Sequence, residues 1–370
     1  MTLYSRLLGL VLAGLLTDSI GAQVPAWRLV QEARVTLPPT MTRAWMPLVL
    51  PDGRWLVVDV RPPYLHLLSA TGYPISAFVE AGEGPGHAVA PAGVGYLAGQ
   101  VWLWDAATQR MSYFDLQGRL RREVPLRVTG MVFPIDANRF VHVPNTYYGV
   151  AGESVKQVKL VILDSTGRNL GTFYRYIDRA SQLSIPRAGG RTQIGSQPYD
   201  RGAYNVYVPF GNGLAVGFPS VVRRDGGTAF RLVRLSGDGR PLFDGWVQIP
   251  GVTVTASHVE NAVRSLRAGP DSADPALPGR IRRALVVPAF MPAFSVGFAG
   301  EQGETWFREF ALGRGGRAWF VVSATGRVIG RFTLPEGQQA IALAPGGLIS
   351  SGEDAQGEPT LTRYRVVRTP

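Results

Sequence analysis

The 370-residue sequence contains no cysteine, and it has only two lysines and four histidines. Without cysteine the chain forms no disulfide, offers no thiol nucleophile and has no thiolate ligand for zinc. The lipid-modified N-terminal cysteine of a bacterial lipoprotein is excluded for the same reason. No two of the histidines (His66, His87, His142 and His258) have the i, i+4 spacing of a helical metal site. No G-x-S-x-G nucleophile elbow is present, so the sequence predicts no catalytic residue.

Long apolar runs are also missing, apart from the ten residues Leu7–Leu16. This run is too short for a membrane span, which needs about 20 residues. It follows a short basic segment and precedes the small pair Gly21-Ala22, the pattern of a secretory signal. We therefore expect a signal peptide over residues 1–22 and a periplasmic or extracellular protein. An uncleaved N-terminal anchor is the alternative, and it would be the only attachment to a membrane.

Acidic residues are fewer than basic ones: the sequence has 27 Asp and Glu and 38 Lys and Arg, which gives a net charge of +11. The basic residues are almost all arginines and are dispersed, without a run of five or six like charges. This pattern favours a solvated basic surface and gives no specific nucleic-acid site. If the charge serves binding, the class of partner that it favours is an acidic protein.

Glycine and proline are abundant, with 45 and 28 residues, and the glycines mark a repeat. Each repeat is an apolar strand, a turn ending in glycine and a second strand, which together predict a β-hairpin. In every copy Asp or Ser stands three residues before the glycine. The five clear copies are 64–78, 110–126, 158–174, 230–246 and 318–334, and their turn glycines are Gly72, Gly118, Gly167, Gly239 and Gly326.

Two further strands precede each hairpin, as in 47–61, so that one unit has four strands and about 40–50 residues, the size of a propeller blade. We place the units near 43–80, 87–128, 129–176, 204–250 and 288–335. A sixth unit, with 338–348 and 361–368, has only three strands, and Trp27–Leu37 supplies the fourth. The sequence thus predicts an all-β fold over residues 23–370: a six-bladed β-propeller of four-stranded antiparallel blades, closed by the N-terminal strand. A two-sheet sandwich is the alternative.

Two insertions interrupt the repeat. Residues 178–203 are polar and rich in Gly, Ser, Arg and Gln, and we expect a long loop there. Residues 255–284 contain Val259, Ala262, Val263 and Leu266 at helical spacing, so we expect a helical insertion that packs against a blade edge or caps one mouth. A second short helical turn over 280–285 follows.

The segments LPDGRWLVVD, LLSATG and AGEGPGH, and later PAFSVGFAGEQGETWFREF and WFVVSATGRVIGRFTLP, carry a resemblance. In them the chain resembles the bacterial exported six-bladed β-propeller family, which is similar to NHL-repeat propellers. The matching G-x-G element is Gly82, Glu83, Gly84, Pro85 and Gly86. A phosphate loop is the alternative interpretation of this element, but the Lys-Ser/Thr ending is missing. The resemblance implies the fold and export, and it carries no reaction.

The candidate binding residues are aromatic and basic residues that we expect on exposed loops and turns. They are Tyr147, Tyr148, Tyr199, Arg201, Arg223 and Arg224. We expect Trp102 and Trp104 in the core instead. The function that these features favour is an exported protein- or ligand-binding or scaffolding module. We expect a protein partner, with an acidic one favoured by the charge, and no cofactor.

A hydrolase or lyase with a divalent metal in the central channel is the alternative function. Calcium is then the candidate ion, because side-chain oxygens near blade starts would be its ligands. The residues in question are Glu83, Asp136, Asn138, Asn205, Asn212 and Glu301. Loop and turn usage explains all of them equally well. The oligomeric state is not predicted.

Overall fold

The computed structural model describes residues 24–144, 156–178, 182–187, 190, 192–199, 202–207, 213–267, 272–300, 302–311 and 316–368. Within these ranges the chain forms 26 β-strands and two helices. Six of the sheets have four antiparallel strands each, in the order that the repeat predicts. The predicted signal peptide, Tyr147, Tyr148 and Arg201 lie outside the described residues.

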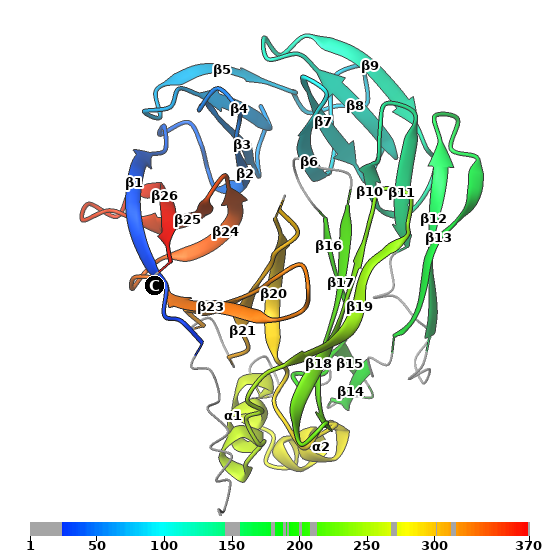
Figure 1. Ribbon diagram of the computed structural model, residues 1–370, viewed down its shortest axis with the longest axis vertical. Helices are drawn as coiled ribbons and strands as arrows, with labels where there is room; N and C mark the ends of the chain where they lie inside the picture. Colours follow the sequence, from blue (N-terminus) through cyan, green and yellow to red (C-terminus); the bar gives the residue numbers. More distant parts are fainter. Residues whose placement is uncertain are drawn as a thin grey trace, which may run out of the picture.

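Each four-stranded sheet is one blade, and the blades follow one another along the chain (Figure 1). Blades 1 to 3 consist of β2 (Ala44–Val49), β3 (Trp55–Asp59), β4 (Leu65–Leu68) and β5 (Pro74–Phe78); β6 (Pro91–Leu97), β7 (Gln100–Asp105), β8 (Arg110–Phe114) and β9 (Leu120–Pro125); and β10 (Gly130–Pro134), β11 (Arg139–Pro144), β12 (Lys156–Asp164) and β13 (Asn169–Asp178). Blades 4 to 6 consist of β16 (Tyr204–Tyr207), β17 (Leu214–Arg224), β18 (Gly227–Leu235) and β19 (Pro241–Gln248); β20 (Phe294–Ala299), β21 (Thr305–Glu309), β22 (Ala318–Val322) and β23 (Val328–Thr333); and β24 (Gln339–Ala344), β25 (Gly347–Glu353), β26 (Pro359–Val367) and β1 (Arg28–Thr36).

The N-terminal strand closes the ring. β1 pairs antiparallel with β26 over its whole length, from Arg28 opposite Val367 to Thr36 opposite Thr360. In Figure 1 the blue β1 lies beside the red β26. Just before β1, the Trp27 amide donates a 2.7 Å hydrogen bond to the carbonyl oxygen of Arg331 in blade 5. The predicted closure by the N-terminal strand is therefore confirmed.

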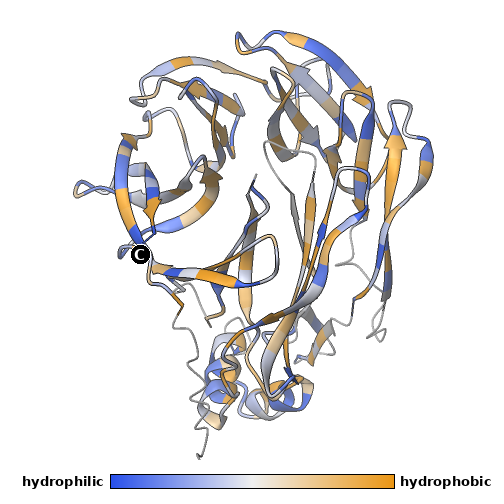
Figure 2. Ribbon diagram, viewed as in Figure 1, coloured by the Kyte–Doolittle hydropathy of each residue, from blue (hydrophilic) through white to orange (hydrophobic). Residues whose placement is uncertain are grey.

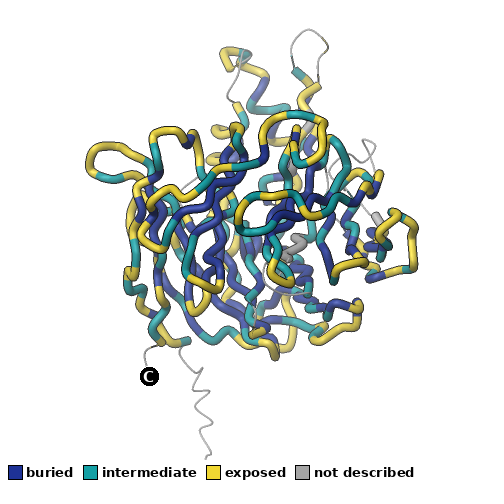
Figure 3. Tube along the Cα trace, turned by 90° about the horizontal axis from the view of Figure 1, so that it is seen from above, coloured by how far each residue is buried: buried dark blue, intermediate teal, exposed yellow. Residues whose placement is uncertain are grey.

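In the described part of the ring, the core is divided into six hydrophobic clusters, and each joins two neighbouring blades. The cluster with Val57 and Ile349 joins blade 1 to blade 6 and so completes the circle. Apolar residues alternate along the strands (Figure 2) and the buried segments run through the blades, with exposed turns at their ends (Figure 3). A two-sheet sandwich would have one core between two layers, so the clusters exclude it.

The repeated turn glycines explain how the blades fit together. All five have φ between +77° and +88°, a region that favours glycine. Four of them also lie against the outermost strand or the end of the preceding blade; Gly118, for example, faces Phe78 of blade 1, whose ring would lie 2.8 Å from an added Cβ. Gly326 faces Phe243 of blade 4 in the same way. The glycine therefore serves both the turn and the contact between blades.

The two insertions form one unit, although they are far apart in sequence. Where we expected a long loop over 178–203, the chain forms a hairpin of β14 (Gln182–Pro186) and β15 (Thr192–Ser196), so that expectation is wrong. The helical insertion is confirmed as α1 (Ala256–Leu266) and α2 (Leu277–Ala284). The buried residues of both insertions pack in one cluster, which contains Leu183, Ile185, Tyr199, Ala262, Val263, Leu277, Ile281 and Leu285.

We call this unit, residues 182–199 and 255–285, the accessory unit; it lies below β18 and β20 in Figure 1. Only two apolar residues of β14, Leu183 and Ile185, alternate in a polar stretch, and they are buried because the helices cover them. The helices that bury these two residues belong to the other insertion. The sequence around β14 alone therefore did not indicate a strand. Neither helix is long and apolar enough to cross a membrane in the part of the chain that the structure describes.

Candidate functional site

A groove of about 410 Å³ lies between α1 of the accessory unit and blades 4 and 5. Because successive strands of a blade run in opposite directions, the β17–β18 turn and the connections that carry both insertions lie at the same end of the blades. We call this end of the ring the insertion face. The groove is within the size range of ligand sites, roughly 300–1,000 Å³.

Apolar residues form most of the groove, among them Val221 of β17, Met291 before β20 and Phe310 after β21. Polar side chains enter from two sides. His258 and Asn261 come from α1, whereas Glu309 and Arg331 come from blade 5. A few polar groups that converge on an apolar surface are typical of a binding site.

In blades 1 and 2, the residue at the same place in the sheet as Glu309 fixes the backbone. In blades 1 and 2 the last residue of the second strand is Asp59 or Asp105, paired with the first residue of the first strand. The Asp59 carboxylate accepts hydrogen bonds of 2.7 and 3.0 Å from the two amides that precede β2. Asp105 accepts bonds of the same two lengths from the amides that precede β6. Each aspartate thereby fixes the connection into its blade.

Glu309 occupies this register position in blade 5, opposite Phe294, but the amides are no longer available. The two preceding residues are Pro292, which has no N–H, and Ala293, whose amide donates to the carbonyl of Pro219 at 2.7 Å. The Glu309 carboxylate instead accepts a 2.5 Å hydrogen bond from Arg331 and lines the groove. Blade 5 thus keeps an acidic residue at this position, but its carboxylate faces the groove and does not bind the backbone of the blade connection.

His258 ties the groove to the accessory unit. The Thr255 amide donates a 3.1 Å hydrogen bond to Nδ1 of His258, which therefore accepts and leaves the ring proton on Nε2 when the ring is neutral. The carbonyl of His258 accepts a hydrogen bond from the Tyr199 hydroxyl. A residue of α1 that lines the groove is thereby held by the other insertion.

Tyr199 itself is only 1% exposed and packs in the accessory cluster. The prediction that it lies on an exposed surface is wrong, because the helical insertion covers the segment that carries it. Its role is to join the two insertions. Trp102 and Trp104 are fully buried, as predicted.

Arg223 and Arg224 are exposed at the end of β17, beside the groove. The Arg223 guanidinium lies over the Phe290 ring, with its carbon 5.4 Å from the ring centre. Arg224 lies over Trp246 at 4.8 Å and pairs with Asp225 at 3.4 Å. Each arginine is thus positioned by an aromatic ring on one side of the hairpin while its donors stay accessible to a partner.

The element Gly82–Gly86 forms the connection between blades 1 and 2. Gly82 and Gly86 have φ of +151° and +75°. The Gly86 amide donates to Glu123 Oε1 at 3.0 Å, and Arg110 donates to the Gly84 carbonyl at 3.2 Å. Pro85 and the exposed Glu83 complete the turn. Its observed contacts are those of a structural connection.

The candidates for a channel metal are not gathered into one site in the described part of the chain. Asp136 accepts hydrogen bonds in its own turn from the Asn138 and Arg139 amides, both at 2.9 Å. Asn212, Glu301 and the side chain of Asn205 lie outside the described residues. Over the described ranges, no group of three or more His, Asp or Glu is placed to hold a metal ion.

No protein-family model matches the sequence, and no curated protein matches it significantly. Solved structures are similar in fold. One is a Bacteroides fragilis protein described as exported, with 10% identity and a TM-score of 0.52 over 92% of this chain and 96% of that chain. Another is a DUF4221 family member from Bacteroides vulgatus, with 10% identity and a TM-score of 0.50 over 94% of this chain and all of that chain. These likenesses support the propeller fold alone, and the NHL-like part of the resemblance stays a prediction.

Proposed function

We propose that the protein is an exported binding module that holds an acidic protein segment on its insertion face. The groove beside α1 would take the apolar side chains of that segment. Arg223 and Arg224 would pair with its carboxylates. The observation that carries the proposal is the redirected Glu309–Arg331 pair, because it places polar groups in an apolar groove, whereas blades 1 and 2 use the same position structurally.

The charge of the insertions supports an acidic partner. Residues 178–203 and 255–284 together contain nine arginines against five acidic residues. A small part of the chain therefore supplies more than a third of the net charge of +11. Such an excess raises the association rate of an acidic partner and makes the affinity depend on salt.

Exposed apolar residues on the same face support a protein partner. Val252 lines the groove and is 59% exposed. Val286 and Val287 follow α2 and are 43% and 47% exposed, and Val222 stands beside Arg223. Apolar contacts surrounded by arginine and aromatic side chains are typical of interfaces between proteins. Export, which the leader and the structural neighbours favour, would place this partner in the cell envelope or outside the cell.

The test is a photo-crosslinking amino acid at Val252, in the full-length protein expressed in its own host. We expect one acidic envelope protein to be captured, and its segment then serves as the peptide for titrations. The variant Arg223→Ala/Arg224→Ala should weaken binding at least tenfold at low salt, with a smaller effect at high salt. The control variant is Arg240→Ala/Arg327→Ala.

The control removes the same charge from the turns at the other end of blades 4 and 5. β18 has nine residues, so Arg240 is roughly 30 Å from the Arg223 tip. If the two double variants weaken binding equally, the insertion face is not the site. The alternative, a hydrolase or lyase with a divalent ion in the channel, would be supported by bound metal in the purified protein.

A further inference from the structure

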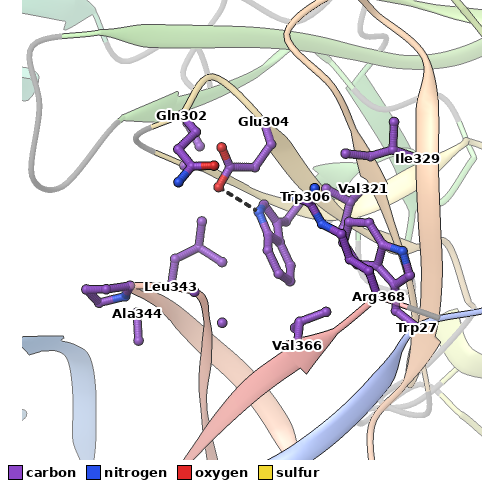
Figure 4. A pocket seen from close by; sticks show the side chains of 15 residues that line it. Trp27, Gln302, Glu304, Trp306, Val321, Ile329, Leu343, Ala344, Val366 and Arg368 are labelled. Carbon is purple, nitrogen blue, oxygen red and sulfur yellow. Dashed lines mark hydrogen bonds between the residues drawn. The ribbon is translucent and has the colours of Figure 1, made fainter. Parts of the chain in front are cut away.

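A second cavity, of about 280 Å³, lies between blades 5 and 6 (Figure 4). Its walls include the β20–β21 and β24–β25 turns, which are at the end of the ring opposite the insertion face. Trp27, which precedes the closing strand, forms another wall. The volume is slightly below the usual range of ligand sites, so the cavity suits a small molecule.

Glu304 is the acidic residue among the described residues that line this cavity. Its Oε1 is 3.5 Å from Nε1 of Trp306, a long and weak hydrogen bond. Its Oε2 is buried and has no hydrogen-bond partner. In Figure 4 the Glu304 carboxylate and Gln302 lie at one end of the cavity, with Trp306 next to them. Within the described residues this carboxylate has only that one weak donor, so a cation that lies beside the carboxylate in the cavity would be stabilised there.

Arg234 of blade 4 is the protein cation that acts on Glu304. Burial lowers the pKa of Arg234, and the negative charge of Glu304 opposes that effect. Arg234 donates its hydrogen bond to the carbonyl of Ala324, at 3.5 Å. It balances part of the charge of Glu304, but Oε2 remains without a donor.

The other walls suit a cation with an apolar body. The Trp27 and Trp306 rings have their centres 6.2 Å apart at 64°. The Arg368 guanidinium already lies over Trp27, 5.3 Å from its centre, at the other end of the cavity. Val321 and Leu343 add aliphatic surface. Indole faces attract ammonium ions and bind apolar chains equally well.

We propose that this cavity binds a small organic ammonium ion. The ammonium group pairs with the Glu304 carboxylate, and its aliphatic chain packs against Trp27 and Trp306. A ligand that also carries a carboxylate would place it near Arg368. The site is separate from the insertion face, so either proposal can fail without the other.

The experiment is calorimetric titration of the full chain with n-butylammonium, 4-aminobutyrate and n-butanol. The first two share the ammonium group and a four-carbon chain, and the third lacks the charge. We expect saturable binding of butylammonium at least tenfold tighter than that of butanol. Tighter binding of 4-aminobutyrate than of butylammonium would identify an amino acid as the ligand class, and the reverse order a simple amine.

Two variants locate the binding. Glu304→Gln should weaken butylammonium binding at least tenfold, because the amide keeps the shape and loses the charge. Arg368→Gln should weaken 4-aminobutyrate binding more than butylammonium binding, because it removes the cation that would face the carboxylate. The comparison of butylammonium with butanol on the unaltered chain needs no variant and so does not depend on folding. Equal binding of the two, no saturable binding, or unchanged binding by Glu304→Gln would overturn the proposal.

Discussion

Gly72 of blade 1 lies directly against Val35 of β1, the strand that completes blade 6. All three of the nearest atoms to a Cβ on Gly72 belong to the Val35 side chain. The same relationship joins the turn glycines of later blades to the blade before each of them, as for Gly118 and Phe78. The contact between blades 6 and 1, where the two ends of the ring meet, is therefore of the same kind as the contacts between the other neighbouring blades.

Replacement of Gly72 tests this joint. Gly72→Ala strains a turn at φ +88° and also places a methyl group against the Val35 side chain, too close for normal contact. The matched control is Gly53→Ala, with φ +85° and its nearest neighbour, the Cβ of Ala70, at 3.7 Å. The control should cost about 1–2 kcal/mol from backbone strain, and Gly72→Ala about 1–3 kcal/mol more from overpacking. Urea unfolding measures both, and equal losses would contradict the role of the Val35 contact.

Asp105 gives a prediction about pH. Burial acts to raise its pKa, but hydrogen bonds from the Val89 and Ala90 amides outweigh that effect, and the pKa is lowered overall. Its contribution to stability is therefore full above the ordinary pKa near 4 and is lost as the pH falls through the folded-state value. Asp105→Asn should cost roughly 2–3 kcal/mol at pH 7. Unfolding curves should show the difference from the unaltered protein shrinking below pH 4.

Glu309 should behave differently from Asp105, because it holds no amide of the blade connection. Its ion pair with Arg331 is about one-third exposed on both sides, and such pairs contribute up to about 1 kcal/mol. Glu309→Gln should therefore destabilise the protein by less than about 1 kcal/mol at pH 7, in the same unfolding assay. A loss as large as that of Asp105→Asn would show that Glu309 still has the structural use of this position.

The accessory unit should unfold separately when its internal joint is weakened. Tyr199→Phe removes the hydroxyl that donates to the His258 carbonyl, at a cost of about 1 kcal/mol. Hydrogen exchange should become faster in α1 and leave β22, in the core of blade 5, unchanged. Tyr73→Phe, at a tyrosine that is 76% exposed on blade 1, is the control. Faster exchange in β22 as well would mean that the unit is not separable from the ring.

The repeat in the sequence was enough to predict the six blades, because each turn glycine marks a local hairpin and the three-stranded last unit needs a partner. β14 was missed because its two buried residues depend on helices about 80 residues later. Tyr199 was misplaced for the same reason: an aromatic residue between polar neighbours looks exposed until its cover is known. The different use of Glu309 could be recognised only from the strand register. That register aligns Glu309 with Asp59 and Asp105, and only then does Pro292 explain why the amide contacts are lost.

The pairing of β1 with β26 also sets an order of events during biosynthesis. Of the strands that the structure describes, β26 (Pro359–Val367) is the last to be translated, so β1 has no partner until that segment has been made. An unpaired strand edge is prone to associate with other chains. A protein truncated before Pro359 would keep this edge permanently open, and we expect such a product to aggregate or be degraded even though most of its blades are complete.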